Sequence, residues 1–206
     1  MSEVNVSLRE RHRAQTSREI HEAVWELSRR NGYGATTVEA IAERAGVSRR
    51  TFFNYFACKE DAVLGLKPVH IPQAALENYE DPTTGDEFSR TVRLFMAVLR
   101  HSAGFSATGT ERKELLAANP DLSRKIGLHI TAAESLVAST VAGHSTASTS
   151  TRASERSQAY VLMAGSVLKY VYRNNEDLTS NSDPDVVDRA VEQALSVFRS
   201  AFKEVS

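Results

Sequence analysis

Apolar residues recur at every third or fourth position along most of this 206-residue chain, and this spacing predicts amphipathic α-helices. The first predicted helix spans residues 16–30, where Ile20, Val24 and Leu27 form one apolar stripe. The Asn31-Gly32 pair is expected to end it, because these residue types commonly close a helix.

A second, shorter helix is predicted to begin at Thr36 or Thr37. Thr36 and Glu39 have the spacing of a capping box, in which each side chain bonds to a free backbone N–H of the first turn. Gly46 is expected to end this helix, since glycine adopts the left-handed conformation without strain.

Ser48 is a good N-cap for a third helix over residues 48–56, and a fourth is predicted to begin around residues 58–60. The later helices are predicted over residues 87–101, 110–118, 121–142, 155–173 and 184–205. Residues 143–154 are rich in Ser and Thr and are predicted to be a linker. No segment shows the strict alternation of a strand, so the pattern predicts an all-α fold.

Residues 36–56 have the residue types that a helix-turn-helix requires. Two short helices that cross steeply need a small residue where they touch, and Ala42 supplies it. The tight turn between them needs a positive φ, which Gly46 tolerates. Val47, Phe52 and Phe56 are then expected to face the core.

This arrangement leaves the third helix with an outward set whose chemistry suits DNA. In the major groove arginine pairs with guanine and asparagine with adenine, and a tyrosine hydroxyl can reach a phosphate. The alternative is a compact three-helix unit whose basic face is merely solvated. The outward set is Arg49, Arg50, Thr51, Phe53, Asn54 and Tyr55.

The order of these residues resembles the N-terminal part of the tetracycline-repressor (TetR) family. The resemblance is carried by the residues from Gly34 to Leu64, and the motif similarity covers roughly residues 10–66. It implies a homodimer, a palindromic operator in double-stranded DNA, and a pocket for a small-molecule effector in the second domain. By position it implies DNA contacts at Thr37, Arg49, Arg50, Thr51, Asn54, Tyr55 and Lys59, and we add their neighbours Ser48 and Phe53 to the predicted DNA-binding set.

Two positions depart from the family pattern. Phe53 stands where the family often has Tyr, so a phosphate hydrogen bond is missing there. Ala57-Cys58 replace a common Pro-Ser, which puts a thiol at the N-cap of the fourth helix. Beside Lys59 this thiol could have a lowered pKa and be oxidisable. An ordinary, poor cap is the favoured interpretation, because no second cysteine is present to resolve an oxidised one.

The last two predicted helices carry more apolar surface than one core face requires. Residues 159–172 are apolar nearly all round, and the final helix has an unusually wide apolar arc. Both can be central helices of a monomeric core, or they can form a dimer interface, as in the four-helix bundle of the resembled family. The predicted interface residues are Val167, Tyr170, Val171, Val191, Leu195, Phe198 and Phe202.

An effector pocket is expected among the helices between residues 87 and 173, lined by apolar side chains with two histidines. Apolar residues at helical spacing are also what an ordinary core requires. The predicted ligand-binding residues are Phe95, Leu99, His101, Phe105, Leu122, Ile126, His129, Leu162 and Met163.

Composition adds a charge asymmetry and a cellular setting. Residues 1–59 hold 10 Lys and Arg against 7 Asp and Glu, whereas the remaining residues hold 15 against 19. A basic front suits a polyanion. The single cysteine suits a reducing compartment, no signal peptide is recognisable, and the apolar run 159–172 is too short for a bilayer. We therefore expect a cytoplasmic protein that does not engage a membrane.

No catalytic motif is recognisable, and the six histidines lack metal-site spacing, so we expect no enzyme activity, no cofactor and no metal. The predicted domains are a three-helix helix-turn-helix DNA-binding domain (1–58) and a larger effector-binding and dimerisation domain (59–206). Together they predict a transcriptional repressor, released from a palindromic operator when a small hydrophobic molecule binds the second domain. The alternative is a ligand-independent regulator or architectural protein with a packed second domain.

Overall fold

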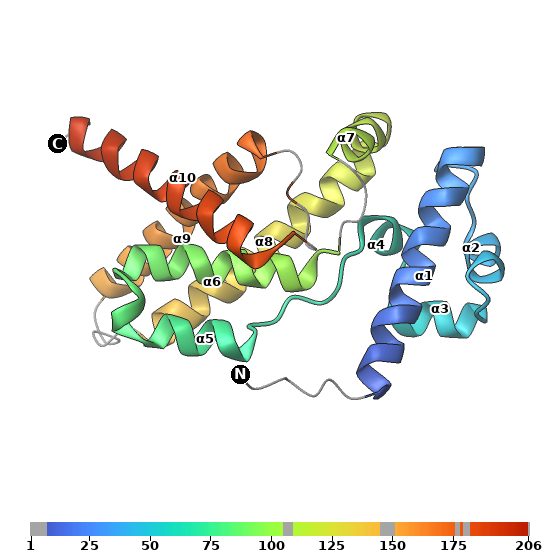
Figure 1. Ribbon diagram of the computed structural model, residues 1–206, viewed down its shortest axis with the longest axis horizontal. Helices are drawn as coiled ribbons and strands as arrows, with labels where there is room; N and C mark the ends of the chain where they lie inside the picture. Colours follow the sequence, from blue (N-terminus) through green and yellow to red (C-terminus); the bar gives the residue numbers. More distant parts are fainter. Residues whose placement is uncertain (1–7, 105–108, 145–150, 176–177, 179–181, 206) are drawn as a thin grey trace. The chain divides into compact units, whose positions relative to one another are not determined.

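The computed structural model describes residues 8–104, 109–144, 151–175, 178 and 182–205, and the regular elements in these ranges are all helices (Figure 1). The predicted all-α fold is thereby confirmed. The chain divides into two compact units, the N-terminal unit (Met1–Lys67) and the C-terminal unit (Pro68–Ser206).

The N-terminal unit contains four helices: α1 (Leu8–Asn31), α2 (Val38–Arg44), α3 (Arg49–Tyr55) and α4 (Lys59–Leu64). Helix α1 begins well before the predicted start at residue 16. Its first turns have no apolar stripe, but they consist largely of Arg, Glu, Gln and Ala, which are strong helix formers.

Helix α2 begins with a cap that differs from the predicted one. The Thr37 side chain accepts a hydrogen bond from the Ala40 N–H at 3.2 Å, whereas the buried Thr36 hydroxyl donates to the Gly32 carbonyl at 3.1 Å. The predicted capping box of Thr36 with Glu39 was therefore wrong, because Thr36 closes the preceding turn. Gly46 has φ +68°, as the predicted turn requires.

Helix α4 packs into the N-terminal unit. The Trp25 indole N–H donates to the Val63 carbonyl at 2.9 Å, and the His21 ring bonds to the Ala62 carbonyl at 2.6 Å. The predicted domain border lies before α4, whereas the structural division lies after Lys67. The reason is that these bonds and the burial of α4 side chains attach this helix to α1.

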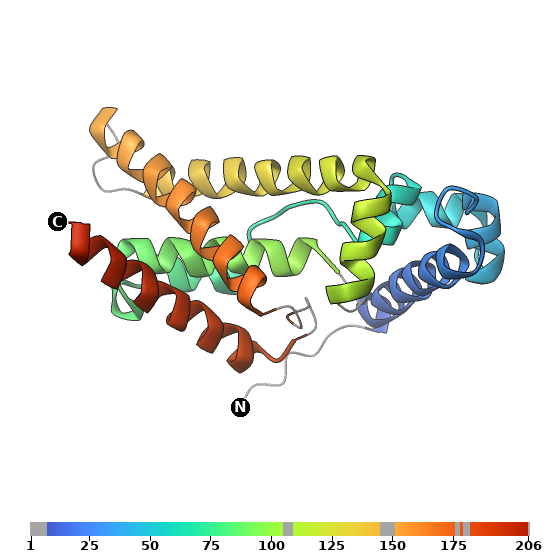
Figure 2. The same ribbon diagram turned by 90° about the horizontal axis from the view of Figure 1, so that it is seen from above.

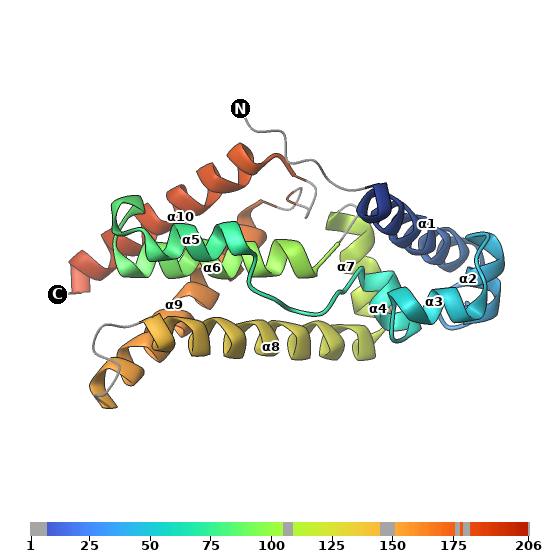
Figure 3. The same cartoon turned by 90° about the horizontal axis from the view of Figure 1, so that it is seen from below.

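The C-terminal unit contains α5 (Gln73–Glu80), the 3₁₀-helix η1 (Pro82–Thr84), α6 (Glu87–Ser102), α7 (Gly109–Ala118), α8 (Pro120–His144), α9 (Thr151–Asn174) and α10 (Pro184–Val205). Helix α6 packs against α5, α8, α9 and α10, and Figures 2 and 3 show α8 and α10 on opposite sides of it. The core lies along α6, where Val92, Phe95 and Val98 are fully buried.

Helix α8 is long and apolar enough, by length and composition, to cross a membrane, and only 17% of its most apolar stretch is buried. It is the single such helix within the described ranges. The apolar run at residues 159–172 lies in α9, which does not meet the same criterion. Two large apolar side chains of α8, Leu128 and Ile130, are exposed.

Candidate functional site

Helix α3 separates a buried side from an exposed side. Phe52 is fully buried and Phe56, directly after the helix, is 2% exposed, so both belong to the core of the N-terminal unit. Arg49, Arg50 and Asn54 are exposed on the other side. The Ser48 side chain accepts a hydrogen bond from the Thr51 N–H at 3.0 Å, which fixes where this helix begins.

The exposed polar residues of α3 differ in how they are engaged. Arg49 forms an ion pair with Glu39 at 2.7 Å and lies over the ring of Phe53. Arg50 and Asn54, in contrast, make no hydrogen bond or ion pair within the described part of the chain. Their donors and acceptors are therefore free for a ligand.

The remaining members of the predicted DNA-binding set are partly engaged. The hydroxyls of Ser48 and Thr51 are bonded to each other at 2.8 Å. Phe53 is 45% exposed and meets Phe52 edge to face. Tyr55 is half-buried, and its ring carries the guanidinium of Arg13 at 5.8 Å, a neighbour that sequence reasoning missed.

Lys59 makes contacts within the N-terminal unit. Its ammonium group donates to the carbonyls of Tyr33 (3.0 Å) and Thr36 (2.9 Å) and lies 4.2 Å from the centre of the Tyr33 ring. These contacts tie the start of α4 to the loop that precedes α2. Two of the three ammonium hydrogens are thus used, and one is left for a phosphate.

Cys58 caps α4 without a side-chain bond to the backbone of the first turn. Its thiol donates to Asp61 at 3.2 Å. Burial, together with the hydrogen bonds to Asp61 and Glu60, raises the pKa of Cys58 to about 11. The lowered pKa considered for this thiol was therefore wrong, since burial, with the side-chain hydrogen bonds to the neighbouring carboxylates, outweighs the effect expected of Lys59.

Residues 20–64, which contain the second half of α1 and all of α2, α3 and α4, match the family of bacterial regulatory proteins named tetR. This stretch of the N-terminal unit is a TetR-family sequence. This match confirms the resemblance found in the sequence. It covers the helix-turn-helix together with α4, the last helix of the N-terminal unit.

Solved structures of two TetR-family proteins are similar to the chain as a whole. One is a transcriptional regulator from Mesorhizobium loti MAFF303099, with 20% identity, a TM-score of 0.37, and coverage of 90% of this chain and 97% of that one. The other is the repressor FadR from Thermus thermophilus in complex with lauroyl-CoA, with 21% identity, a TM-score of 0.30, and coverage of 88% and 92%. No curated protein matches the chain.

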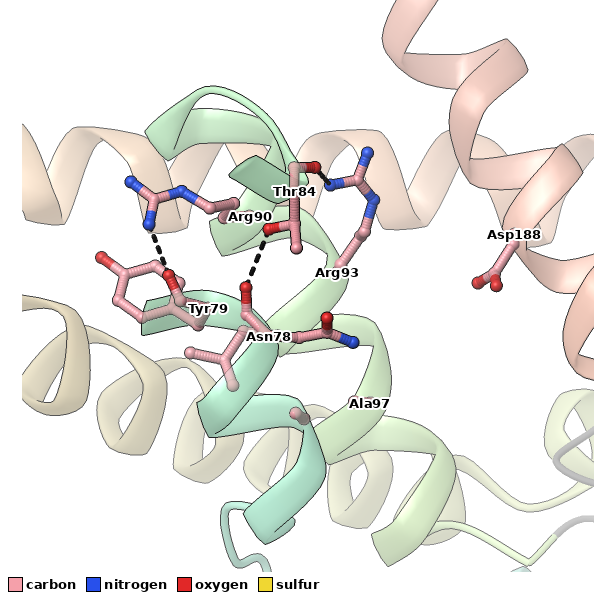
Figure 4. Close-up of a pocket in the computed structure, with 9 residues that line it drawn as sticks. Asn78, Tyr79, Thr84, Arg90, Arg93, Ala97 and Asp188 are labelled. Carbon is pink, nitrogen blue, oxygen red and sulfur yellow. Dashed lines mark hydrogen bonds between the residues drawn. The ribbon is translucent and has the colours of Figure 1, made fainter. Parts of the chain in front are cut away.

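The C-terminal unit has a pocket of about 300 Å³ between α5, η1, α6 and α10 (Figure 4). The guanidinium of Arg93 is fixed beside it by the Thr84 carbonyl at 2.7 Å and by Glu192 at 2.6 Å. Asn78 and Asp188 add an amide and a carboxylate. The full lining is Ala75, Asn78, Tyr79, Thr84, Arg90, Arg93, Leu94, Ala97 and Asp188.

None of the predicted ligand-binding residues lines this pocket. Phe95 and Leu122 are fully buried, whereas Leu162 is 61% exposed. His129 bonds to the Ser102 hydroxyl at 2.9 Å, and His101 is exposed. Leu99, Ile126 and Met163 are half-buried, and Phe105 lies outside the described residues.

The predicted interface residues fall into two groups. Val167, Val171, Val191 and Leu195 are at most 2% exposed and lie in the core of the unit, so a partner cannot reach them. They were selected because helical spacing alone does not distinguish an internal core from an interface. The other three, Tyr170, Phe198 and Phe202, form a continuous row of rings with centres 5.9 and 6.5 Å apart.

Helix α10 also has exposed apolar residues that were not predicted as interface residues. They are Val186 and Val197, each 42% exposed, and Phe202 itself is 49% exposed.

Within the described residues, no group of three or more His, Cys, Asp or Glu could hold a metal ion.

Proposed function

We propose that this protein is a transcriptional repressor that binds a palindromic operator in double-stranded DNA as a homodimer. The N-terminal unit reads the DNA, and the C-terminal unit dimerises and binds a small-molecule effector that releases it. The protein acts in the cytoplasm by binding and catalyses no reaction.

The observation that carries the proposal is the exposed side of α3 within a TetR-family unit. Arg50 and Asn54 are free of internal partners, on a short helix whose start is fixed by Ser48 and whose other side is anchored by Phe52. A rigid helix with free arginine and asparagine side chains matches what base recognition in the major groove requires.

Selection from random double-stranded DNA by the full chain is the direct test. It is expected to return an inverted repeat whose half-sites are one DNA turn apart, about 34 Å. Arg50→Ala is expected to weaken binding to that repeat by about 1–3 kcal/mol and to relax one base position. Arg30→Ala, at an exposed position on α1, is the matched control. A selection that enriches no sequence would contradict the proposal.

The effector site is proposed to be the pocket of Figure 4. Its lining combines the fixed guanidinium of Arg93 with the apolar side chains of Leu94 and Ala97. This combination favours an amphipathic effector with a hydrogen-bond acceptor over a purely hydrophobic one.

A ligand-independent regulator is the second candidate, and the full burial of Phe95 and Leu122 favours it. In that case the C-terminal unit only dimerises. The two candidates differ in whether occupation of the pocket changes DNA affinity.

A further inference from the structure

Helix α1 extends beyond the core of the N-terminal unit, and its projecting end is basic (Figure 1). The inward stripe of α1 contains Ile20 and Val24, both fully buried. Seven residues are nearly two helical turns, so Arg13 continues this stripe toward the N-terminus, and Arg9 lies one further turn along it. Both arginines are exposed, because the core ends before it reaches them.

Arg13 reaches the helix that bears the DNA-binding set. Its guanidinium carbon lies 5.8 Å from the centre of the Tyr55 ring, at the last residue of α3. A guanidinium over an aromatic face keeps its N–H groups at its rim, where they can bind a phosphate in two-pronged fashion. Within the described residues neither Arg13 nor Arg9 has a carboxylate or hydrogen-bond partner.

The opposite side of α1 provides a contrast. Arg18, five residues after Arg13 and therefore well round the helix, donates to the Gln15 side chain at 2.8 Å. Arg18 is exposed, as Arg13 is, but within the described residues it makes no hydrogen bond, ion pair or ring contact with α3. Two arginines of the same helix thus differ in whether they lie beside α3.

We infer that Arg13 contacts a DNA phosphate beside α3 and that Arg9 extends this contact along the backbone. The inference rests on the proposed DNA binding, and it widens the DNA-binding surface from the helix-turn-helix to the first turns of α1. Arg13 is at the Tyr55 end of α3, away from the turn that bears Arg50, so it adds affinity without reading bases.

The salt dependence of DNA binding tests the inference. The affinity of the full chain is measured against salt concentration, on the selected operator and on random DNA, for the wild type, Arg13→Ala, Arg13→Lys and Arg18→Ala. Arg13→Ala is expected to reduce the magnitude of the slope of log K against log salt by about 0.9. It is also expected to lower the affinity for both DNAs about 3- to 10-fold at low salt. Arg13→Lys is expected to keep the slope, and Arg18→Ala to behave as the wild type.

An Arg13→Ala slope equal to that of Arg18→Ala overturns the inference, and so does a loss confined to the operator, which would mean base recognition. Thermal unfolding of the variants establishes that the fold is unchanged. The measurement on random DNA separates this inference from the proposed function. A missing preference for the operator would contradict the proposed sequence-specific regulator, whereas the contribution of Arg13 to the salt slope would still be measured on random DNA.

Discussion

Lys59 has two of its three ammonium hydrogens bonded to the carbonyls of Tyr33 and Thr36, so its main role is internal. We expect Lys59→Ala to lower the free energy of unfolding by about 1–3 kcal/mol, because two carbonyls in a half-buried loop lose their donor.

Denaturant unfolding of the full chain measures this change, with Arg50→Ala as the control that leaves stability unaltered. If Lys59→Ala weakens DNA binding and leaves the free energy of unfolding unchanged, the residue is a phosphate contact and its hydrogen bonds to the two carbonyls do not stabilise the fold.

His21 makes the stability of the N-terminal unit depend on pH. Burial lowers the pKa of its ring below 6.5, outweighing the hydrogen bond to the Ala62 carbonyl and the nearby charge of Glu22, which raise it, while Lys67 lowers it further. The other ring nitrogen is buried without a partner among the described residues.

The unfolded chain therefore binds a proton more readily than the folded one below pH 6.5. Stability that is present above this value is expected to be lost as the pH falls through it. Thermal unfolding of the full chain between pH 7.5 and 5 is expected to show a steeper decline for the wild type than for His21→Phe. The exposed His12 supplies the control, since His12→Gln is expected to keep the wild-type slope.

At the scale of single helices, α1 and α10 share one feature with opposite chemistry. Each has an inward stripe that continues past the end of its core. On α1 the continuation is Arg13, and on α10 it is Phe202, which follows Phe198, the last residue of this stripe that packs against the core. An exposed arginine is stable in water and gains from an anion, whereas an exposed aromatic row gains from being covered by protein.

We propose that the row of Tyr170, Phe198 and Phe202, together with Val197, is the dimer contact. Phe202→Glu would place an unpaired carboxylate in a desolvated interface, so sedimentation is expected to show monomers and operator affinity is expected to collapse. Ser196→Glu puts the same charge on the far side of α10 and is expected to leave the dimer intact. A dimer that survives both Phe202→Glu and Tyr170→Glu would place the interface elsewhere.

For the whole molecule, a ligand in the C-terminal unit can release DNA only if the two binding events are coupled, and coupling is reciprocal. The anionic dye 1-anilinonaphthalene-8-sulfonate is a suitable probe of the pocket, because Arg93 can receive its sulfonate. If the pocket is the effector site, saturating operator is expected to weaken dye binding by the same factor by which the dye weakens operator binding.

Calorimetry in the presence and absence of operator measures this factor, which for typical couplings is about 5- to 150-fold. Asp188→Asn removes one negative charge from the pocket lining and is expected to raise the affinity for the anionic dye. Dye binding that is indifferent to operator would favour the ligand-independent regulator.

The sequence by itself determined the helical class and the N-terminal helix-turn-helix. The turn at Gly46, the cap at Ser48 and the burial of Phe52 depend on neighbours within a few residues, and local chemistry is what periodicity and residue type report. The separation of Phe52 from Arg50 follows from helical spacing alone.

Only the tertiary structure decided which stripes are internal and which remain uncovered. Val167 and Phe202 are both apolar residues at helical spacing in the sequence, yet the first is fully buried in the core and the second is 49% exposed. Lys59, Arg13 and the pocket at Arg93 likewise depend on partners far along the chain, at Tyr33, Tyr55 and Glu192. Such contacts arise where helices meet in space, and the spacing of residues within one helix carries no record of its neighbours.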